Sequence, residues 1–207
     1  MDTLVVDHPL AGQLLTRMRD ERTDRAVFRQ AADELALMLV YEATRTLATE
    51  PVTVRTPLTE TAGVRVQRPP MVVPVLRAGL GMLGPVLRLL PGSDTGFIGV
   101  ARNESTHEPE PYMNSVPDDL DGRDVLVLDP MLATGGSMAF ACAQLAARNP
   151  GTITAVCILA APEGVERLAG TGLVDRLWTA SIDDHLDDDA FIVPGLGDAG
   201  DRLFGTA

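Results

Sequence analysis

Lysine is absent from this 207-residue chain, so all 17 of its basic residues are arginines. The chain therefore has no Walker-type phosphate lysine, no Schiff-base lysine and no lysine general base. Aspartate and glutamate number 29, which gives a formal net charge of −12. Because nucleic-acid binding needs a clustered basic face, this balance argues against a nucleic-acid partner. An anionic ligand must then be held by single arginines, backbone amides, helix N-termini or a metal ion.

Long apolar runs and clusters of cysteine are also missing. No apolar stretch approaches the roughly 18 residues that cross a bilayer, and the N-terminus lacks the basic-then-apolar order of a signal peptide. We therefore expect no membrane association and a cytoplasmic location. The two cysteines, Cys142 and Cys157, show neither metal-ligand spacing nor a disulfide framework, so we expect buried, reduced thiols.

Hydrophobic periodicity predicts an alternating order of elements. Helices are expected at 10–22 and 24–48, the second stopped by Pro51, and a β-rich stretch follows at 52–66. The remainder is expected to run as strand 71–75, helix 80–89, strands 96–101 and 124–128, helix 137–148, strand 152–159, helix 163–169 and strand 174–179. Such alternation predicts an α/β fold with a parallel sheet flanked by helices.

Two polar segments interrupt this pattern. Residues 102–112 are too hydrophilic for a core, so we expect a mobile loop or a β-arm, or else a surface loop without a role. Five aspartates within 183–189 indicate a solvated face. The glycine-rich run at 191–204 favours a backbone shaped around a ligand, although a tight C-terminal turn remains an alternative.

The strongest motif is a buried strand at 124–128 that ends on Asp129 and turns through glycines into a helix. Ligands of open α/β sheets bind at such strand ends. Asp129 is placed to accept hydrogen bonds from vicinal ribose hydroxyls or to hold a hydrated Mg²⁺. Backbone amides and hydroxyls of the turn, together with the helix N-terminus, suit a phosphate dianion; they belong to Thr134, Gly135, Gly136 and Ser137. We call residues 129–137 the phosphate cradle; the alternative is an ordinary strand-to-helix turn.

A second glycine motif follows the strand at 71–75. Residues 79–84 match GxGxxG, and Glu104 lies about 20 residues further on, as in a dinucleotide site, so an NAD-dependent dehydrogenase is a rival interpretation. Two details disfavour that rival. Arg77 precedes the first glycine and adds a full charge that the dinucleotide fingerprint does not need, and Glu104 lies in the polar excursion rather than at a strand end.

Together these motifs resemble one family. The run Asp-Pro-Met-Leu-Ala-Thr-Gly-Gly-Ser at 129–137 resembles the motif of type I phosphoribosyltransferases that binds phosphoribosyl diphosphate (PRPP), in its uracil phosphoribosyltransferase form. The likeness runs from His8-Pro9-Leu10 to Phe204-Gly205-Thr206. It implies one type I phosphoribosyltransferase domain over 1–207, with N-terminal helices, a β-arm and a small C-terminal hood. The core would span about 68–182, and the hood would combine the N-terminal segment with 183–207.

The resemblance also implies a reaction and a set of site residues. PRPP would give its phosphoribosyl group to N1 of uracil, which yields UMP and diphosphate. Catalytic contacts are implied for Arg77, Asp129 and Asp198. The PRPP-binding set comprises Arg77, Ala78, Gly79, Arg102, Asp129, Pro130, Met131, Leu132, Ala133, Thr134, Gly135, Gly136, Ser137 and Asp198. The uracil-binding set comprises Ile192, Gly197, Asp198 and Ala199.

A glycine-rich backbone suits the edge of uracil. The amides of Gly197 and Ala199 can donate to the two carbonyls, while the Ile192 carbonyl accepts from N3–H. Cytosine inverts part of this pattern and leaves a buried group unpaired, at a cost of roughly 1–3 kcal/mol. We therefore expect selectivity for uracil.

Several partners follow from the resemblance alone. Mg²⁺ is expected as cofactor, but this chain has Asp129-Pro130 where many relatives of other specificity carry two adjacent acids, so its protein ligands stay unassigned. A homodimer or higher homo-oligomer is expected, and GTP is raised as an effector that the sequence does not demonstrate. Two alternatives share the fold: a PRPP-binding regulator without turnover, and a phosphoribosyltransferase for another base. No histidine among His8, His107 and His185 matches a catalytic pattern.

Overall fold

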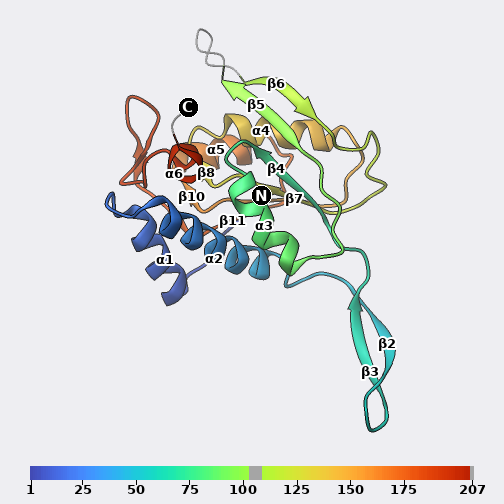
Figure 1. Cartoon of the computed structure of the whole chain (residues 1–207). Helices are drawn as coiled ribbons and strands as arrows, with labels where there is room; N and C mark the ends of the chain where they lie inside the picture. Colours follow the sequence, from blue (N-terminus) through green and yellow to red (C-terminus); the bar gives the residue numbers. More distant parts are fainter. Residues whose placement is uncertain (103–108, 206–207) are drawn as a thin grey trace.

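The computed structural model describes residues 1–102 and 109–205, with the side chains of Arg102 and Pro109 excepted. Glu104 and His107, singled out above, lie outside this described part. The main sheet contains β1 (Asp2–Val5), β4 (Met71–Leu76), β5 (Ile98–Arg102), β6 (Pro109–Asn114), β7 (Val125–Leu128), β9 (Ile153–Val156) and β11 (Arg176–Thr179). Their order is β1-β11-β9-β7-β4-β5-β6. Figure 1 shows β5 and β6 side by side at one end of this sheet. Neighbours from β1 to β5 are parallel, and β6 runs antiparallel to β5, so the predicted parallel sheet is confirmed.

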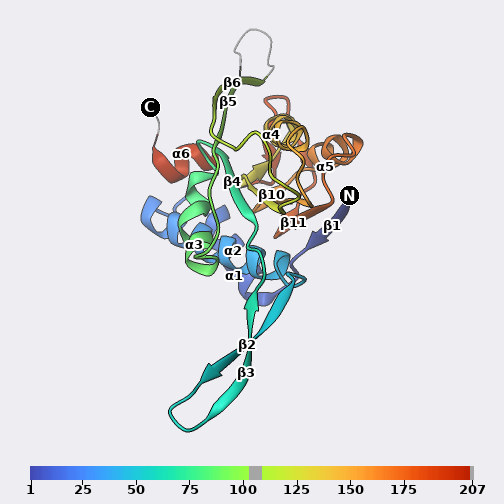
Figure 2. The ribbon, with the colours of Figure 1, turned by 90° about the vertical axis from the view of Figure 1, so that its right-hand side faces the viewer.

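Helices cover both faces of this sheet (Figure 2). They are α1 (Pro9–Arg19), α2 (Arg25–Ala43), α3 (Leu80–Leu89), α4 (Gly136–Ala146), α5 (Pro162–Gly170) and α6 (Ala199–Phe204). Alternate strand residues enter two separate cores. Val72, Leu126 and Val156 pack with α1, α2 and α3, whereas Val73, Val127 and Ala155 pack with α4 and α5. A strand that is buried on both faces must be apolar throughout, which explains the unbroken hydrophobic runs of β4 and β7.

The first two helices are shorter than their periodicity predicts. α1 ends at Arg19 because the Asp20 carboxylate accepts a hydrogen bond from the Arg22 N–H and turns the chain outward. Asp24 then caps α2 by accepting from the Val27 N–H at 2.9 Å. α2 ends at Ala43 rather than at 48.

Two features at the edges differ from the prediction. β1 was not predicted, because four residues at a chain end carry little periodicity; it pairs in parallel with β11. The β-rich stretch is a hairpin of β2 (Thr49–Arg55) and β3 (Glu60–Val66) that extends away from the body (Figures 1 and 2). Pro51 therefore lies inside a strand, not at a helix end. Leu58 at the hairpin tip is 93% exposed.

Short strands shape the carboxyl side of the sheet. β8 (Met131–Leu132), β10 (Leu159–Ala160) and β12 (Ser181–Ile182) form one small sheet, and β13 (His185–Leu186) pairs with β14 (Ile192–Val193). The predicted strand 152–159 is split because the Pro130 carbonyl accepts from both Ile158 and Leu159 N–H groups. Cys142 and Cys157 are buried and unpaired, and burial raises the pKa of each thiol to about 12. Among the described residues, no helix has the length and apolar character needed to cross a membrane.

Candidate functional site

Two glycine-bearing loops meet at one edge of the sheet. β4 and β7 are parallel neighbours, so the loops that follow them leave the same edge. The first, residues 77–79, we call the arginine loop; the second is the phosphate cradle. A methyl group on Gly79 would contact the Leu128 carbonyl and lie 2.7 Å from the Val75 carbonyl. Glycine is required there because the two strand ends approach so closely.

The phosphate cradle forms a small cavity of about 90 Å³. Gly135 has a positive φ of 74° and precedes α4, whose N-terminus has no side-chain cap. The first N–H groups of α4 are therefore open to an anion. A methyl group on Gly135 would lie 2.9 Å from the Gly164 carbonyl, so close packing also demands glycine. The cavity is lined by Asp129, Met131, Leu132, Ala133, Thr134, Gly135, Gly136, Ser137 and Met138.

Asp129 occupies the end of β7 in a half-buried position. Burial raises the pKa of this carboxyl to about 7, and a hydrogen bond from the Met131 backbone amide opposes the shift. A carboxyl with this pKa changes charge near neutral pH. A cation or several hydroxyl donors placed beside it would favour the ionised form.

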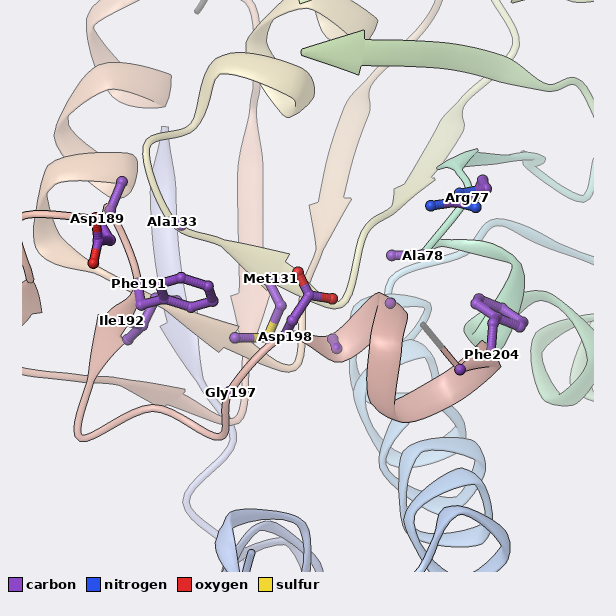
Figure 3. Close-up of a pocket in the computed structure, with 14 residues that line it drawn as sticks. Arg77, Ala78, Met131, Ala133, Asp189, Phe191, Ile192, Gly197, Asp198 and Phe204 are labelled. Atoms are coloured by element: carbon purple, nitrogen blue, oxygen red, sulfur yellow. The ribbon is translucent and has the colours of Figure 1, made fainter. Parts of the chain in front are cut away.

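A larger cavity of about 370 Å³ adjoins the cradle and continues to the arginine loop (Figure 3). Arg77 is exposed at its rim and has no ion pair within residues 1–102 and 109–205. The C-terminal segment closes the opposite side. Of the predicted site residues, the cavity brings together Arg77, Ala78, Met131, Ala133, Ile192, Gly197, Asp198 and Ala199.

Besides the residues that line one of the two cavities, three predicted residues remain. Gly79 and Pro130 are buried beneath the two loops, where they shape the backbone. Arg102 is the last residue of β5, and its side chain lies outside the described part. Gly81 packs against Leu203 of α6, since a methyl group there would lie 2.7 Å from a leucine methyl carbon. The GxGxxG spacing is thus accounted for in part by packing.

The backbone facing the cavity from the C-terminal side we call the hood loop, residues 192–199. Its Val193–Pro194 peptide is cis, and Gly195 and Gly197 have positive φ values of 63° and 77°. Within the described ranges, the N–H groups of Gly197 and Ala199 donate to no atom of the chain. Both residues line the cavity, so two donors are available to a ligand there.

One expectation about the aspartates is wrong. Asp183 does not belong to a solvated face: it is buried, and its carboxylate forms a two-pronged ion pair with Arg19 at 2.6 and 2.7 Å. It also accepts from the Gly195 N–H at 2.9 Å. Composition could not separate Asp183 from its four neighbours because the partner, Arg19, lies 164 residues away.

Sequence reasoning also missed residues that border the site. Phe191 and Phe204 line the larger cavity while each remains nearly half exposed, and Asp189 lies beside Phe191 (Figure 3). Arg167 of α5 lies next to the cradle, since a methyl group on Gly136 would be 3.5 Å from its Nη1. Phe191 and Phe204 fall within the glycine-rich run at 191–204 that was predicted to be shaped around a ligand, whereas no sequence motif indicates Arg167.

Comparison with known proteins gives consistent matches. The family model described as Uracil phosphoribosyltransferase matches residues 5–206. A curated uracil phosphoribosyltransferase of Corynebacterium diphtheriae is 57% identical over 99% of this chain and 97% of its own length. One from Corynebacterium glutamicum is 52% identical over the same shares.

Solved structures agree with the fold. A protein of Aquifex aeolicus superposes with a TM-score of 0.92 at 35% identity, over 99% of both chains. A hypoxanthine-guanine phosphoribosyltransferase of Bacillus anthracis gives a TM-score of 0.51 at 15% identity, over 77% of this chain and 80% of its own. The second likeness bears on the fold alone, and it identifies the sheet and its helices as the type I phosphoribosyltransferase architecture.

Proposed function

Because this chain belongs to the uracil phosphoribosyltransferase family, we propose that the cavity between the arginine loop, the phosphate cradle and the hood loop is its active site. The enzyme is a pentosyltransferase of pyrimidine salvage that makes UMP and diphosphate from uracil and PRPP. Family membership contradicts the dehydrogenase interpretation. The observation that carries the site proposal is that both strand-end loops and the C-terminal segment line adjoining cavities.

In the proposed arrangement, PRPP lies across the two strand-end loops. The open amides at the start of α4 would bind its 5′-phosphate, supported by the cradle hydroxyls. Asp129 would accept hydrogen bonds from the ribose hydroxyls, which favours its ionised form. Arg77, exposed and without an ion pair to any described residue, would stabilise the diphosphate as it leaves.

Uracil would lie under the hood loop. Gly197 and Ala199 offer N–H donors for its carbonyls, and Ile192 lines the same cavity. As the bond from ribose C1 to the diphosphate oxygen breaks, a bond from C1 to uracil N1 forms, and the N1 proton leaves to Asp198 through water or directly to solvent. The enzyme's contribution is positioning together with stabilisation of the leaving charge.

Magnesium fits the site only in company with the substrate. The described ranges contain no group of three or more His, Cys, Asp or Glu side chains arranged to hold a metal ion. Magnesium is often held by one or two carboxylates together with substrate phosphates. Asp198 suits this role because one carboxylate oxygen caps α6 at 2.8 Å and the other accepts no hydrogen bond from the described residues. When bound, the ion would neutralise charge on the diphosphate.

We also propose the division of the chain into a core of about 68–182 and a hood made from the N-terminal segment and 183–207. Contacts of Arg19 with Asp183 and of Arg202 with the end of α1 support a hood built from both chain ends. Closure of the arm, 103–117, over the site is part of the same proposal, although 103–108 lie outside the described residues.

The state of assembly and the regulation are further proposals. A homo-oligomer is supported by apolar side chains that the chain leaves exposed: Val54, Leu58 and Val64 on the hairpin, and Leu10 and Tyr41 beside an apolar cavity. Light scattering of the purified chain tests this.

GTP activation is tested by initial rates at subsaturating PRPP with and without GTP. A cytoplasmic location agrees with the unpaired cysteines.

The proposed site is tested by a product assay with PRPP, Mg²⁺ and each of uracil, cytosine, hypoxanthine and orotate. We expect nucleotide and diphosphate from uracil and from no other base of this panel. Equal use of cytosine would contradict the assignment of the hood amides, because its 4-amino group cannot accept a hydrogen bond.

A further inference from the structure

Two arginines hold successive peptide groups of the hood loop. Arg19 in α1 donates from Nη1 to the Gly195 carbonyl at 2.7 Å. Arg202 in α6 donates from Nη1 to the next carbonyl, that of Leu196, at 2.9 Å. Gly195 and Leu196 are both buried. The backbone immediately before Gly197 is therefore fixed by side chains from opposite ends of the chain.

Arg202 is itself held in one orientation. Its guanidinium donates to the Met18 carbonyl and, at 2.8 Å, to the Asp20 carbonyl, where α1 ends. It also lies 4.3 Å from the centre of the Phe28 ring. Because the planar guanidinium donates to three carbonyls on two segments at once, the end of α1 and the hood loop, it cannot rotate without losing several hydrogen bonds.

Arg19 is held as firmly by Asp183. Both Nη atoms bind the Asp183 carboxylate, which also accepts from the Ser181 hydroxyl at 3.0 Å and from the Gly195 N–H at 2.9 Å. The Gly195 residue is thus held through its N–H by Asp183 and through its carbonyl by Arg19. The ion pair and the loop form one connected network.

These contacts determine where the Gly197 N–H points. The Leu196 carbonyl and the Gly197 N–H belong to one trans peptide, in which the two groups point in opposite directions. Arg202 draws the carbonyl toward α1, so the N–H is directed to the other side. Gly197 lines the cavity, and in the described ranges its N–H has no acceptor.

We propose that Arg202, supported by the Arg19–Asp183 pair, is a positioning residue for uracil that orients the Gly197 N–H toward a uracil carbonyl. This inference rests on the proposed function of the hood loop and extends it to side chains that do not touch the substrate. A purely structural role for Arg202 would instead affect stability and lower activity equally for every base.

Thio analogues distinguish the two roles. Sulfur accepts hydrogen bonds more weakly than oxygen, so the kcat/KM of uracil relative to 2-thiouracil and 4-thiouracil reports on the bond at each carbonyl. The intrinsic reactivity of each analogue cancels when two enzymes are compared. The lysine of Arg202→Lys cannot donate to all the backbone carbonyls that Arg202 binds. For one of the two analogues, we therefore expect the ratio of kcat/KM for uracil to kcat/KM for the analogue to fall about fivefold from its wild-type value. The uracil KM should rise by a similar factor while the PRPP KM stays near wild type.

Control variants keep the test interpretable. Arg22→Met removes an arginine that is 83% exposed and pairs with Asp20 in the adjacent turn. Its kcat/KM ratios of uracil to 2-thiouracil and of uracil to 4-thiouracil should therefore both match wild type. Unfolding temperatures establish that each variant is folded. If Arg202→Lys does not fold, the double variant Arg19→Gln/Asp183→Asn removes the supporting pair without a lone buried charge and should lower the same ratio by about twofold.

The outcomes separate this inference from the proposed function. If the wild-type enzyme uses both thio analogues as well as uracil, no hood amide binds a carbonyl, and the proposed role of the hood loop is wrong. A second outcome is that the wild-type enzyme prefers uracil over a thio analogue, with every folded Arg202 or Arg19/Asp183 variant keeping the same preference in kcat/KM. In that case the positioning inference is wrong, while the hood assignment stands.

Discussion

The phosphate cradle and the hood loop hold the backbone that lines their cavities in different ways. In the cradle and the adjacent arginine loop, glycines pack directly against neighbouring backbone, as at Gly135 against Gly164 and Gly79 against Val75. In the hood loop, the backbone is held by arginine side chains, and Arg19 reaches Gly195 across 176 positions of sequence. The cradle region is thus held by backbone packed against backbone of the strands and of α5, whereas the hood loop is held by side chains from α1 and α6.

This difference separates two kinds of tolerance to mutation. Backbone packed on backbone cannot yield, so one added methyl group in the cradle region should disturb both stability and PRPP binding. A backbone held by flexible side chains can shift slightly while the protein stays folded. Changes at the hood should then alter the choice of base before they unfold the enzyme.

The largest effect is expected for Gly79→Ala. The added carbon would contact the Leu128 carbonyl and both the amide and the carbonyl of Val75, all of them backbone atoms. We expect a loss of about 3 kcal/mol in unfolding free energy. Displacement of the arginine loop by about 1 Å should lower kcat/KM for PRPP about a hundredfold.

Gly84→Ala is the matched control, since it changes the last glycine of the same pattern on α3. An added methyl group there meets nothing closer than Arg88 Nη1 at 3.9 Å. This variant should retain activity and gain up to about 1 kcal/mol from helix propensity. Equal damage at both positions would show that the arginine loop is not fixed by backbone packing.

Asp129→Asn should lower kcat about a hundredfold in a folded enzyme, because the neutral amide cannot strengthen hydrogen bonds to the ribose hydroxyls through charge. Steady-state kinetics at saturating PRPP measure this effect. Thermal unfolding should show a variant at least as stable as the wild type at pH 7, since the substitution removes a poorly solvated carboxyl. Near-normal turnover would refute the ribose or metal role of Asp129.

The stability difference at this position should depend on pH. Burial raises the folded pKa of Asp129 to about 7 from an ordinary value of 3.8. Between these values the unfolded chain loses the proton and the folded protein keeps it, so wild-type stability falls as pH rises through this window. Relative to the wild type, Asp129→Asn should therefore gain on the order of 1 kcal/mol in unfolding free energy between pH 4 and pH 7.

For Asp94→Asn, the stability difference from wild type should change with pH in the opposite direction. The Arg123 guanidinium holds the pKa of Asp94 below its ordinary value, so the wild-type carboxylate stabilises the fold above that ordinary value and loses this contribution as pH falls. Chemical unfolding at a series of pH values measures both variants. Parallel curves for Asp129→Asn and wild type would contradict the raised pKa.

The same contrast explains what could be predicted from the sequence. The alternation of strands and helices, the cradle and the arginine loop are local patterns, and the structure confirms the elements that carry them. The hood loop was recognised by its glycines, but its supports were not, because Asp183 looked like one of five similar aspartates until its partner Arg19 was located. β1 and the split of β9 from β10 also depend on pairing with distant segments.

The smallest effect is expected at the cradle, from Arg167, a side chain beside it that no motif indicated. Arg167 is exposed and lies beside the first turn of α4, so its charge should assist phosphate binding only weakly. Arg167→Ala should raise the PRPP KM about twofold at low salt, with kcat and the uracil KM unchanged, and the difference should vanish at high salt because the charge is screened. Arg22→Ala, with the same loss of charge at a distant exposed position, is the control. If the two variants behave alike, the cradle binds phosphate through its backbone and hydroxyls alone, which would deepen its contrast with a hood loop that depends on arginines.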